Sequence, residues 1–217
     1  MPRAWVIHDY SGYQGLSLEK FDEETPGPGE IRMRIEAFAL NWGDIDLMRD
    51  RYSFSFPEFP ARIGMEAAGI VDAIGPDVTG IETGDRYCTL PYFYYNRGAS
   101  AESLIINARY VTKAPEGFSA VESASIWMQY ITAYFPELPI VDMFQTNAVF
   151  HPYSLFNYIE DSAMCAKGTT FVYDALASGA IAPRIDRVYP MEGYREAWDY
   201  LKAPRRTHGK VVVETGI

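Results

Sequence analysis

The first stretch of the chain whose residue types suit chemistry begins at Asn41, where an amide is followed by a carboxylate at Asp44. Asn41 can cap a short helix, and Asp44 in the first helical turn would interact favourably with the helix dipole. The alternative to this structural role is a place in a binding site. The residues themselves leave both readings open.

Aromatic residues are a second chemical feature, because the chain holds 16 Tyr, 12 Phe and 4 Trp. Many of them fall in two runs, Arg51–Pro60 and Cys88–Asn96. A core alone would not use so many tyrosines, whereas a pocket for a flat, apolar small molecule would. The first run, which contains Tyr52, could equally be a loop that covers the end of the domain.

Metal-ligating residues are few and scattered. The two cysteines, Cys88 and Cys165, are far apart in the sequence, and the three histidines, His8, His151 and His208, lack the spacing of a metal site. We therefore predict no metal site. Two reduced, structural thiols are typical of a cytoplasmic protein, which is the localisation we expect.

Composition excludes some classes of partner. The chain has 19 basic and 29 acidic residues and a net charge of −10. Nucleic acids and anionic membranes are bound by clustered Lys and Arg, so we expect neither as a partner. No apolar run reaches the length of a transmembrane helix, and no signal-peptide pattern is expected at the N-terminus.

The elements that would position these residues are mainly strands. Ala4–His8 and Leu16–Lys20 are predicted strands, and Ile31–Leu40 alternates apolar and charged residues as a half-buried strand does. The stretch Gly64–Tyr87 combines β-branched residues with glycines. Such glycines mark bulges, sharp corners or close backbone approaches, so this stretch predicts a tightly bent, β-rich unit.

Helices are expected later in the chain. Ser119–Phe135 is predicted to be one helix, because Ser119 and Glu122 form the Ser-x-x-Glu pattern of a capping box. Further helices are expected over Ser162–Ser178 and Tyr194–Leu201. Gly27-x-Gly29 is predicted to be a turn and not a nucleotide-binding loop, because no helix follows it.

The run Gly64–Tyr87 also resembles the signature of the medium-chain dehydrogenase/reductase family, in its zinc-free quinone oxidoreductase branch. That signature is Gly-x-Glu/Asp-x-x-Gly-x-Val-x-x-x-Gly, closed by Gly-Asp-Arg. The resemblance implies a GroES-like β-barrel beside a nicotinamide cofactor, NADP(H). It also implies hydride transfer to a quinone or to the β-carbon of an enone, with the developing negative oxygen stabilised by hydrogen bonds.

The resemblance also suggests catalytic residues. Asn41, Asp44 and Tyr52 match positions at the nicotinamide end of the family's site. In zinc-dependent relatives a cysteine ligand stands at the position of Asn41 and a histidine ligand at that of Met65. An amide and a thioether do not replace these ligands, so the resemblance implies a zinc-independent protein.

Cofactor-binding residues follow from the same resemblance. Thr132-Ala133-Tyr134 resembles the Thr-Ala-Tyr element that ends a helix at the cofactor, and Tyr130 lies on the same predicted helix. Together with Asn41, Thr132 and Tyr130 would border the nicotinamide. Lys210, or Arg205 near it, would approach the pyrophosphate. Each residue also has a structural alternative, such as a solvated charge for Lys210.

After Phe135 the resemblance is interrupted. The family pattern would continue into a Rossmann domain, but Pro136 and Pro139 follow, and Gly168 is the only glycine before Gly179. The G-x-G-x-x-G fingerprint is absent. What comes next resembles the family's sequence beyond that domain. The interruption is compatible with an engineered excision, a natural deletion or an annotation artefact.

These observations predict a mainly β fold with α elements. We expect a GroES-like β-barrel catalytic domain with a few flanking helices and no complete Rossmann domain. Residues 1–135 and 181–217 would form the catalytic domain, and 136–180 would be a remnant strand and helix of the deleted nucleotide-binding domain.

Three functions remain open at this stage. The chain could be the catalytic domain of a quinone or enone oxidoreductase that is weak or inactive alone. It could keep weak reductase activity with loosely bound NADP(H), or it could bind a small apolar ligand without catalysis. The apolar run Asn147–Phe156 resembles an edge strand of the family's lost domain. An uncovered edge associates readily, so we expect a homodimer through this run.

Overall fold

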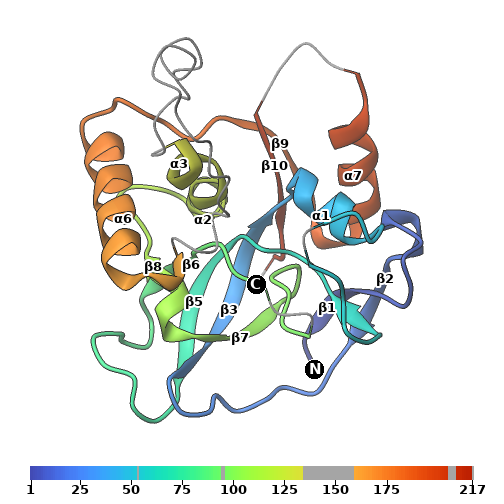
Figure 1. Cartoon of the computed structure of the whole chain (residues 1–217), viewed down its shortest axis with the longest axis horizontal. Coiled ribbons are helices and arrows are strands. Elements are labelled where there is room, and N and C mark those ends of the chain that lie inside the picture. Colours follow the sequence, from blue (N-terminus) through green and yellow to red (C-terminus); the bar gives the residue numbers. More distant parts are fainter. Residues whose placement is uncertain (53, 94–95, 134–158, 205–208, 217) are drawn as a thin grey trace, which may run out of the picture.

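A computed structural model describes residues 1–52, 54–93, 96–133, 159–204 and 209–216 (Figure 1). Its strands form the sheets of the domain, and strands and helices take similar shares of the residues. The strands are β1 (Arg3–Ile7), β2 (Ser17–Lys20), β3 (Glu30–Ala39), β4 (Ala61–Arg62), β5 (Ala67–Ile74), β6 (Arg86–Thr89), β7 (Ser103–Asn107), β8 (Val111–Lys113), β9 (Ile185–Pro190) and β10 (Lys210–Glu214).

The larger sheet in the described part of the chain is built around β3. Its strand order is β8-β6-β5-β3-β10-β9, and β7 also pairs with β3. β3 is antiparallel to β5, β7 and β10, whereas β9 and β10 are parallel to each other. The last strand of the chain therefore lies beside the long central strand, with Val212 opposite Ala39. This pairing brings Lys210, at the start of β10, toward the loop that follows β3.

The mainly β fold with flanking helices is confirmed, but the expected barrel is not closed. β1, β2 and β4 form a separate three-stranded sheet. Within the described residues, β1 reaches the other sheet through an isolated bridge from Ala4 to Ala101 and two flanking hydrogen bonds. The Ala101 N–H donates to the Ala99 carbonyl, 2.8 Å away. Because this N–H is used locally, it does not pair with β1, and the described contact between the two sheets stays an isolated bridge.

A glycine on β5 confirms the close backbone approach expected from the Gly-rich stretch. Gly69 faces Ile35 of β3, and the register shifts just beyond this pair. A Cβ atom at Gly69 would lie 2.2 Å from the carbonyl oxygen of Arg34. Only glycine fits there, because any side chain would overlap the neighbouring backbone.

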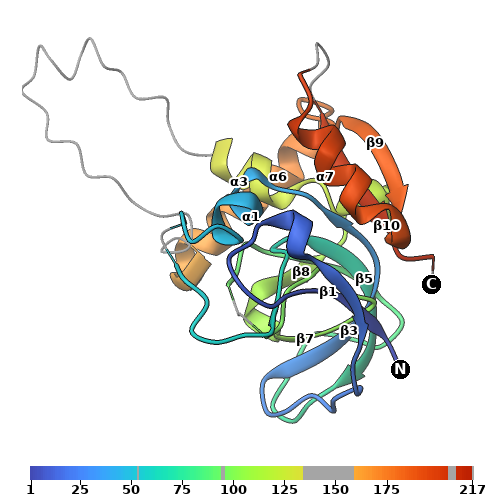
Figure 2. The same ribbon diagram turned by 90° about the vertical axis from the view of Figure 1, so that its right-hand side faces the viewer.

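Helices gather at one end of the curved sheets, as Figures 1 and 2 show. They are α1 (Trp42–Leu47), α2 (Ala120–Ser123), α3 (Trp127–Ala133), α6 (Ser162–Ala177) and α7 (Tyr194–Lys202). The described residues also include the 3-10 turns η1 (Tyr13–Gly15), η2 (Ala108–Tyr110) and η3 (Met191–Gly193). The helices expected at α6 and α7 are confirmed. Within the described ranges, none of the helices is long and apolar enough to cross a bilayer.

The single helix expected over Ser119–Phe135 is wrong, because α2 and α3 are separate in the described part of that range. The capping box of Ser119 and Glu122 is confirmed at the start of α2. The Ser125 hydroxyl donates to the Glu122 carbonyl, 2.7 Å away. A serine side chain that bonds a nearby carbonyl competes with the helical backbone, which accounts for the early end of α2.

Helix α7 lies between the two sheets. Its buried residues, Tyr194, Ala197, Trp198 and Leu201, recur with the spacing of one helical face. The Tyr194 ring contacts Trp5 of β1 at a centroid distance of 5.0 Å and meets Phe38 of β3 edge-on at 5.4 Å. One helix thus joins the small sheet, the large sheet and the end of the chain into a shared core.

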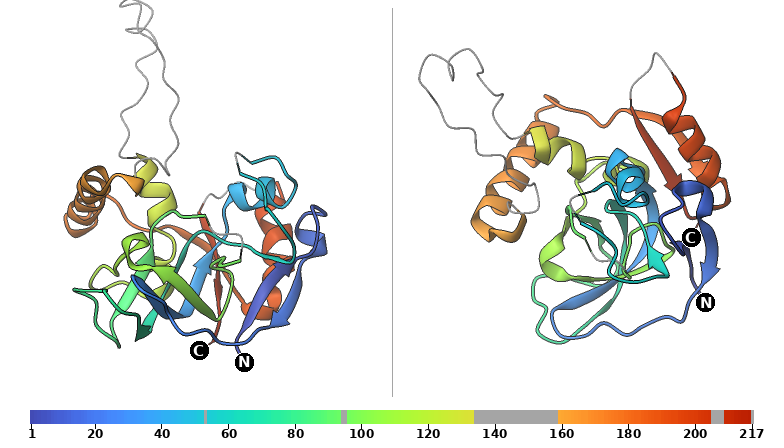
Figure 3. Two further views of the ribbon diagram at one scale, coloured as in Figure 1. Left: turned by 60° about the horizontal axis from the view of Figure 1, so that its bottom comes forward. Right: turned by 45° about the vertical axis from the view of Figure 1, so that its right-hand side comes forward.

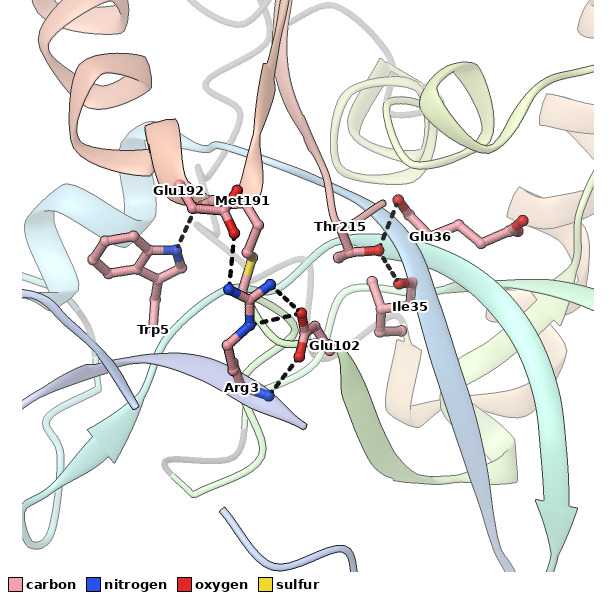
Figure 4. A network of polar contacts seen from close by, with 8 residues as sticks. All are labelled: Arg3, Trp5, Ile35, Glu36, Glu102, Met191, Glu192 and Thr215. Carbon is pink, nitrogen blue, oxygen red and sulfur yellow. Dashed lines mark hydrogen bonds and ion pairs between the residues drawn. The ribbon is translucent and has the colours of Figure 1, made fainter. Parts of the chain in front are cut away.

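Polar contacts reinforce this junction (Figure 4). The Arg3 guanidinium donates to Glu102, at 2.9 Å through Nε, and to Glu192 of η3 at 2.8 Å. The Trp5 indole donates to the carbonyl of Met191, and the Thr215 hydroxyl donates to that of Ile35. The residues after 180 are therefore held against the N-terminal part of the chain, as expected for a domain assembled from both. The domain boundaries themselves stay a prediction.

Several expectations fall outside the described residues. They are the junction at Phe135 and Pro136, the run Asn147–Phe156 and the homodimer expected through it.

Candidate functional site

Asn41 lies at the N-terminus of α1, directly beyond the central strand β3. Its backbone N–H donates to Asp44 Oδ2 at 3.0 Å, so Asp44 caps the first turn. Its side-chain oxygen accepts a hydrogen bond from Lys210 Nζ. Asn41 therefore lies at the start of the helix, as the structural alternative predicts. Its side-chain amide instead contacts Lys210, near the other end of the chain.

Lys210 also forms a buried ion pair with Glu66. Lys210 Nζ lies 2.7 Å from Glu66 Oε2, and the two side chains are only 6% and 1% exposed. The two strands that flank β3 position the pair, because Lys210 begins β10 and Glu66 immediately precedes β5. The solvated-charge alternative for Lys210 is wrong. A charged pair taken out of water is tolerated only when its hydrogen bonds are well satisfied.

The Glu66 carboxylate accepts a second hydrogen bond besides the one from Lys210, so its charge is well satisfied. Its Oε1 accepts from the backbone N–H of Met128 at 2.9 Å, at the beginning of α3. The Asn41 amide nitrogen lies 3.4 Å from Glu66 Oε2 and makes a weaker contact. Lys210, Glu66 and Asn41, with Asp44 beside them, are called the polar cluster below. Within it, Asn41 is the member that solvent reaches most readily.

Asp44 is the second carboxyl of the polar cluster. It is 1% exposed, and its Oδ1 has no hydrogen-bond partner among the described residues. Burial raises the pKa of Asp44 to about 7; the Glu66 charge also raises it, while the Asn41 N–H and the Lys210 charge lower it. Asp44 can therefore hold or release a proton near neutral pH.

Aromatic side chains lie next to the polar cluster. The Tyr52 ring passes close to Gly43 of α1, where an added Cβ would be 3.1 Å from the ring. Burial, followed by the charges of Asp44 and Asp46, raises the pKa of Tyr52. Tyr52 neighbours Phe54 at a centroid distance of 6.0 Å, and Phe54 stacks on Phe93 at 5.2 Å. The residue next to Asn41, Trp42, is 59% exposed.

Among the other expected cofactor residues, Tyr130 is the one whose side chain the structure describes. The Tyr130 hydroxyl donates to the Ala182 carbonyl at 2.7 Å, so this side chain ties α3 to the segment before β9. Thr132 lies on α3, and its side chain is outside the described part. Arg205 falls outside the described residues as well.

The aromatic run after β6 is only partly described. Tyr92 is buried, and its hydroxyl donates to the Arg97 carbonyl at 2.9 Å. Tyr92 is therefore part of the packed core. Tyr94 and Tyr95 lie outside the described residues.

Sequence reasoning missed Glu66. The available signal was that Glu66 is the only charged residue in the apolar run from Gly64 to Val71. A carboxylate in such a run needs a buried partner. The partner, Lys210, is 144 residues away, so no local pattern could identify it.

The residues at the polar cluster do not fit a zinc ion. Asn41 offers an amide oxygen that already accepts from the Lys210 ammonium, and Met65, the residue before Glu66, is a buried thioether. A fixed positive charge at that oxygen disfavours a divalent cation. Across the described ranges, no group of three or more His, Cys, Asp or Glu side chains could hold a metal.

Two family models match the chain. Residues 27–116 match the model described as "Alcohol dehydrogenase GroES-like domain", and residues 107–213 match the one described as "Zinc-binding dehydrogenase". Among curated proteins, the chain is 33% identical over 132 residues to the synaptic vesicle membrane protein VAT-1 homolog-like of Mus musculus. It is 34% identical over 125 residues to the pikromycin polyketide synthase component PikAII of Streptomyces venezuelae.

These matches cover parts of much longer proteins. The alignment with the mouse protein includes 61% of this chain but 30% of that protein, and the alignment with PikAII includes 58% and 3%. The chain thus spans about a third or less of the length of these curated relatives.

Solved structures show the same fold. The human synaptic vesicle membrane protein VAT-1 homolog-like protein superimposes with a TM-score of 0.85 at 19% identity, covering 99% of this chain and 98% of that one. A quinone oxidoreductase of Pseudomonas syringae pv. Tomato DC3000 gives 0.83 at 16% identity, covering 99% and 100%. At these identities the likeness establishes the fold alone.

Proposed function

Because this chain belongs to the medium-chain dehydrogenase/reductase family, we propose that its polar cluster is the oxygen-binding site of a zinc-independent reductase of quinones or enones. NADP(H) would supply the hydride. The chain alone would be a weak catalyst, because the sequence lacks the Gly-rich fingerprint that receives a dinucleotide. Its acceptor would be a small apolar molecule with a carbonyl oxygen.

The observation that carries this proposal is the contact of the Lys210 ammonium with Asn41 Oδ1. A cation bonded to the amide oxygen polarises the amide and strengthens its N–H groups as donors. One N–H is directed toward Glu66 at 3.4 Å, which leaves the other for a ligand. Asn41 would donate it to the carbonyl oxygen of the acceptor, where negative charge develops during reduction.

Glu66 and Asp44 would have supporting roles. Glu66 holds the Lys210 ammonium in place and keeps the polar cluster close to neutral overall. Asp44, whose pKa is about 7, could supply a proton through Oδ1 near neutral pH. Tyr52 and the exposed Trp42 would offer aromatic faces to a planar acceptor.

The test is NADPH-dependent reduction of 1,4-naphthoquinone, followed by the absorbance of NADPH. Asn41→Asp keeps an oxygen acceptor for Lys210 but removes the N–H donors, and Gln14→Ala is a surface control. We expect slow turnover in the wild type, lowered about 100-fold by Asn41→Asp and unchanged by Gln14→Ala. Equal rates in all three proteins would refute the role of Asn41.

A second measurement separates this function from an alternative. The group formed by Trp42, Tyr52, Phe54 and Phe93 favours simple binding of an apolar ligand. Calorimetric titration with NADPH should give a dissociation constant weaker than about 1 μM, corresponding to about −8 kcal/mol. Naphthoquinone binding with neither NADPH binding nor turnover would instead identify a binding module.

A further inference from the structure

A separate cavity lies on the three-stranded sheet. It has a volume of about 400 Å³, and its walls come from β1, β2, β4 and the segments next to them. Its lining residues are Val6, Glu19, Lys20, Phe21, Glu24, Pro60, Arg62 and Asn96. None of them belongs to the polar cluster, and the function proposed above uses none of them.

The Arg62 guanidinium has too few hydrogen-bond and ion-pair partners for a charged group that is largely buried. Its side chain is 17% exposed, and its ion pair among the described residues, with Glu24, spans 4.0 Å. This distance is too long for a hydrogen bond. Within the described ranges its guanidinium makes no hydrogen bond, although it carries five N–H groups. Burial lowers the pKa of Arg62, as expected when a cation loses water without gaining a close anion.

The position of the guanidinium is nevertheless defined. Its central carbon lies 3.8 Å from the centroid of the Phe21 ring. Stacking on an aromatic ring leaves the N–H edges of a guanidinium available to a planar anion. Arg62 is also anchored through its backbone, because β4 pairs with β1 and places Arg62 opposite Val6.

The two acidic residues of the cavity have closer partners than Arg62. Glu19 Oε1 lies 2.6 Å from His8 Nε2 and also accepts from the Ser17 hydroxyl. Glu24 is about half exposed and lies 3.6 Å from Arg97. Lys20 adds a second positive charge to the lining. Because Lys20 is exposed to solvent, Arg62 is the largely buried cation of the lining that lacks a close anion.

Apolar groups complete the site. Phe21 packs on a small buried cluster of Ala4, Val6 and Ala101, and Pro60 lines the cavity beside it. We propose that this cavity binds a small planar carboxylate, with the carboxylate on the guanidinium edge of Arg62 and the flat body against Phe21. Two parallel N–H···O bonds to a carboxylate would give Arg62 the partners that it lacks.

The first test uses benzoate and its neutral isostere benzamide as probes of the whole chain, by calorimetry and ligand-observed NMR. A single charged pair with one apolar contact predicts a dissociation constant for benzoate of about 1 mM. Benzamide should bind at least about tenfold more weakly, because it lacks the charge. Equal affinities for the two probes, or no benzoate binding at about 20 mM, would overturn the proposal.

Variants locate the site. Arg62→Gln should weaken benzoate binding at least about tenfold, and Arg62→Lys should weaken it less, because the charge stays while the planar fork is lost. Arg34→Gln, on an exposed position of β3, is the matched control and should bind as the wild type does. If Arg62→Gln folds as judged by circular dichroism but keeps wild-type affinity, the assignment is wrong.

A crystal soaked in 4-bromobenzoate gives a result that needs no variant. The anomalous signal of bromine should appear beside Phe21, with the carboxylate on Arg62. Bromine located at the polar cluster, or only elsewhere on the surface, would contradict the proposal. That result would leave the proposed reductase function standing, so the two ideas fail separately.

Discussion

Lys210 Nζ lies 2.7 Å from Glu66 Oε2, although 144 residues separate the two in the sequence. The contact joins the last strand of the chain to the start of β5 and to the N-terminus of α3. Because both charges are buried, each depends on the other for its solvation. This dependence makes the pair a good place to test both the stability and the chemistry of the polar cluster.

Lys210→Met should therefore destabilise the protein by about 3–5 kcal/mol, because it leaves the Glu66 carboxylate buried without its cation. Urea denaturation measures the change. The control is Lys113→Met, which removes an exposed pair with Asp85 and should leave the midpoint almost unchanged. Similar midpoints for the two variants would mean that the Lys210–Glu66 pair does not stabilise the fold.

The raised pKa of Asp44 predicts that the stability of the folded protein depends on pH in the acidic to neutral range. Its pKa is raised from 3.8 to about 7 in the folded protein, so the folded state binds the proton more tightly than the unfolded state does. The contribution of Asp44 to stability therefore falls as pH rises from about 4 to 7, by on the order of 4 kcal/mol for a fully buried group.

Asp44→Asn should remove this contribution while keeping an acceptor for the Asn41 N–H. The variant should gain stability over the wild type progressively between pH 4 and pH 7, as measured by thermal unfolding across that range. The exposed neighbour Asp46 provides the control, and Asp46→Asn should follow the wild-type curve. A constant difference between Asp44→Asn and the wild type would disprove the raised pKa.

Gly69→Ala should be strongly destabilising. The new methyl group would lie 2.2 Å from the Arg34 carbonyl oxygen, so β3 and β5 would have to separate. Overpacking of this kind costs about 1–3 kcal/mol. Gly27→Ala is a milder comparison, because its Cβ would meet only the movable end of Glu30, 3.3 Å away. Equal chemical denaturation midpoints for the two variants would argue against the close strand approach.

Trp42 predicts an optical signal for ligand binding. It is 59% exposed and adjacent to Asn41, so a quinone held by the Asn41 amide should quench its fluorescence. Trp42→Phe should remove most of the quenching and weaken naphthoquinone binding only about two- to fivefold, because an aromatic face remains. Trp198 serves for comparison, because it is buried and a ligand at Asn41 should not quench its fluorescence. Undiminished quenching in Trp42→Phe would place the ligand elsewhere.

Local sequence patterns predicted most of the elements. The alternation in Ile31–Leu40 corresponds to β3, the glycine at position 69 marks a close strand approach, and the capping box at Ser119 begins α2. These features depend on side-chain periodicity, backbone freedom and capping, which act over a few residues and can be read from neighbours in the chain. Resemblance to a family suggested Asn41 and Asp44 for the nicotinamide end of an expected cofactor site and Lys210 for its pyrophosphate end, and these roles stay a prediction.

Tertiary structure decided the chemistry of the polar cluster. Glu66 becomes the partner of Lys210 only because β10 joins the sheet beside β3, and Asp44 acquires a pKa near 7 only because packing removes it from water. The open arrangement of the sheets and the break between α2 and α3 differ in cause, because each involves a short-range hydrogen bond, from Ala101 to Ala99 and from Ser125 to Glu122. Burial and long-range pairing depend on which distant segments meet, and that is set by the packing of the whole chain.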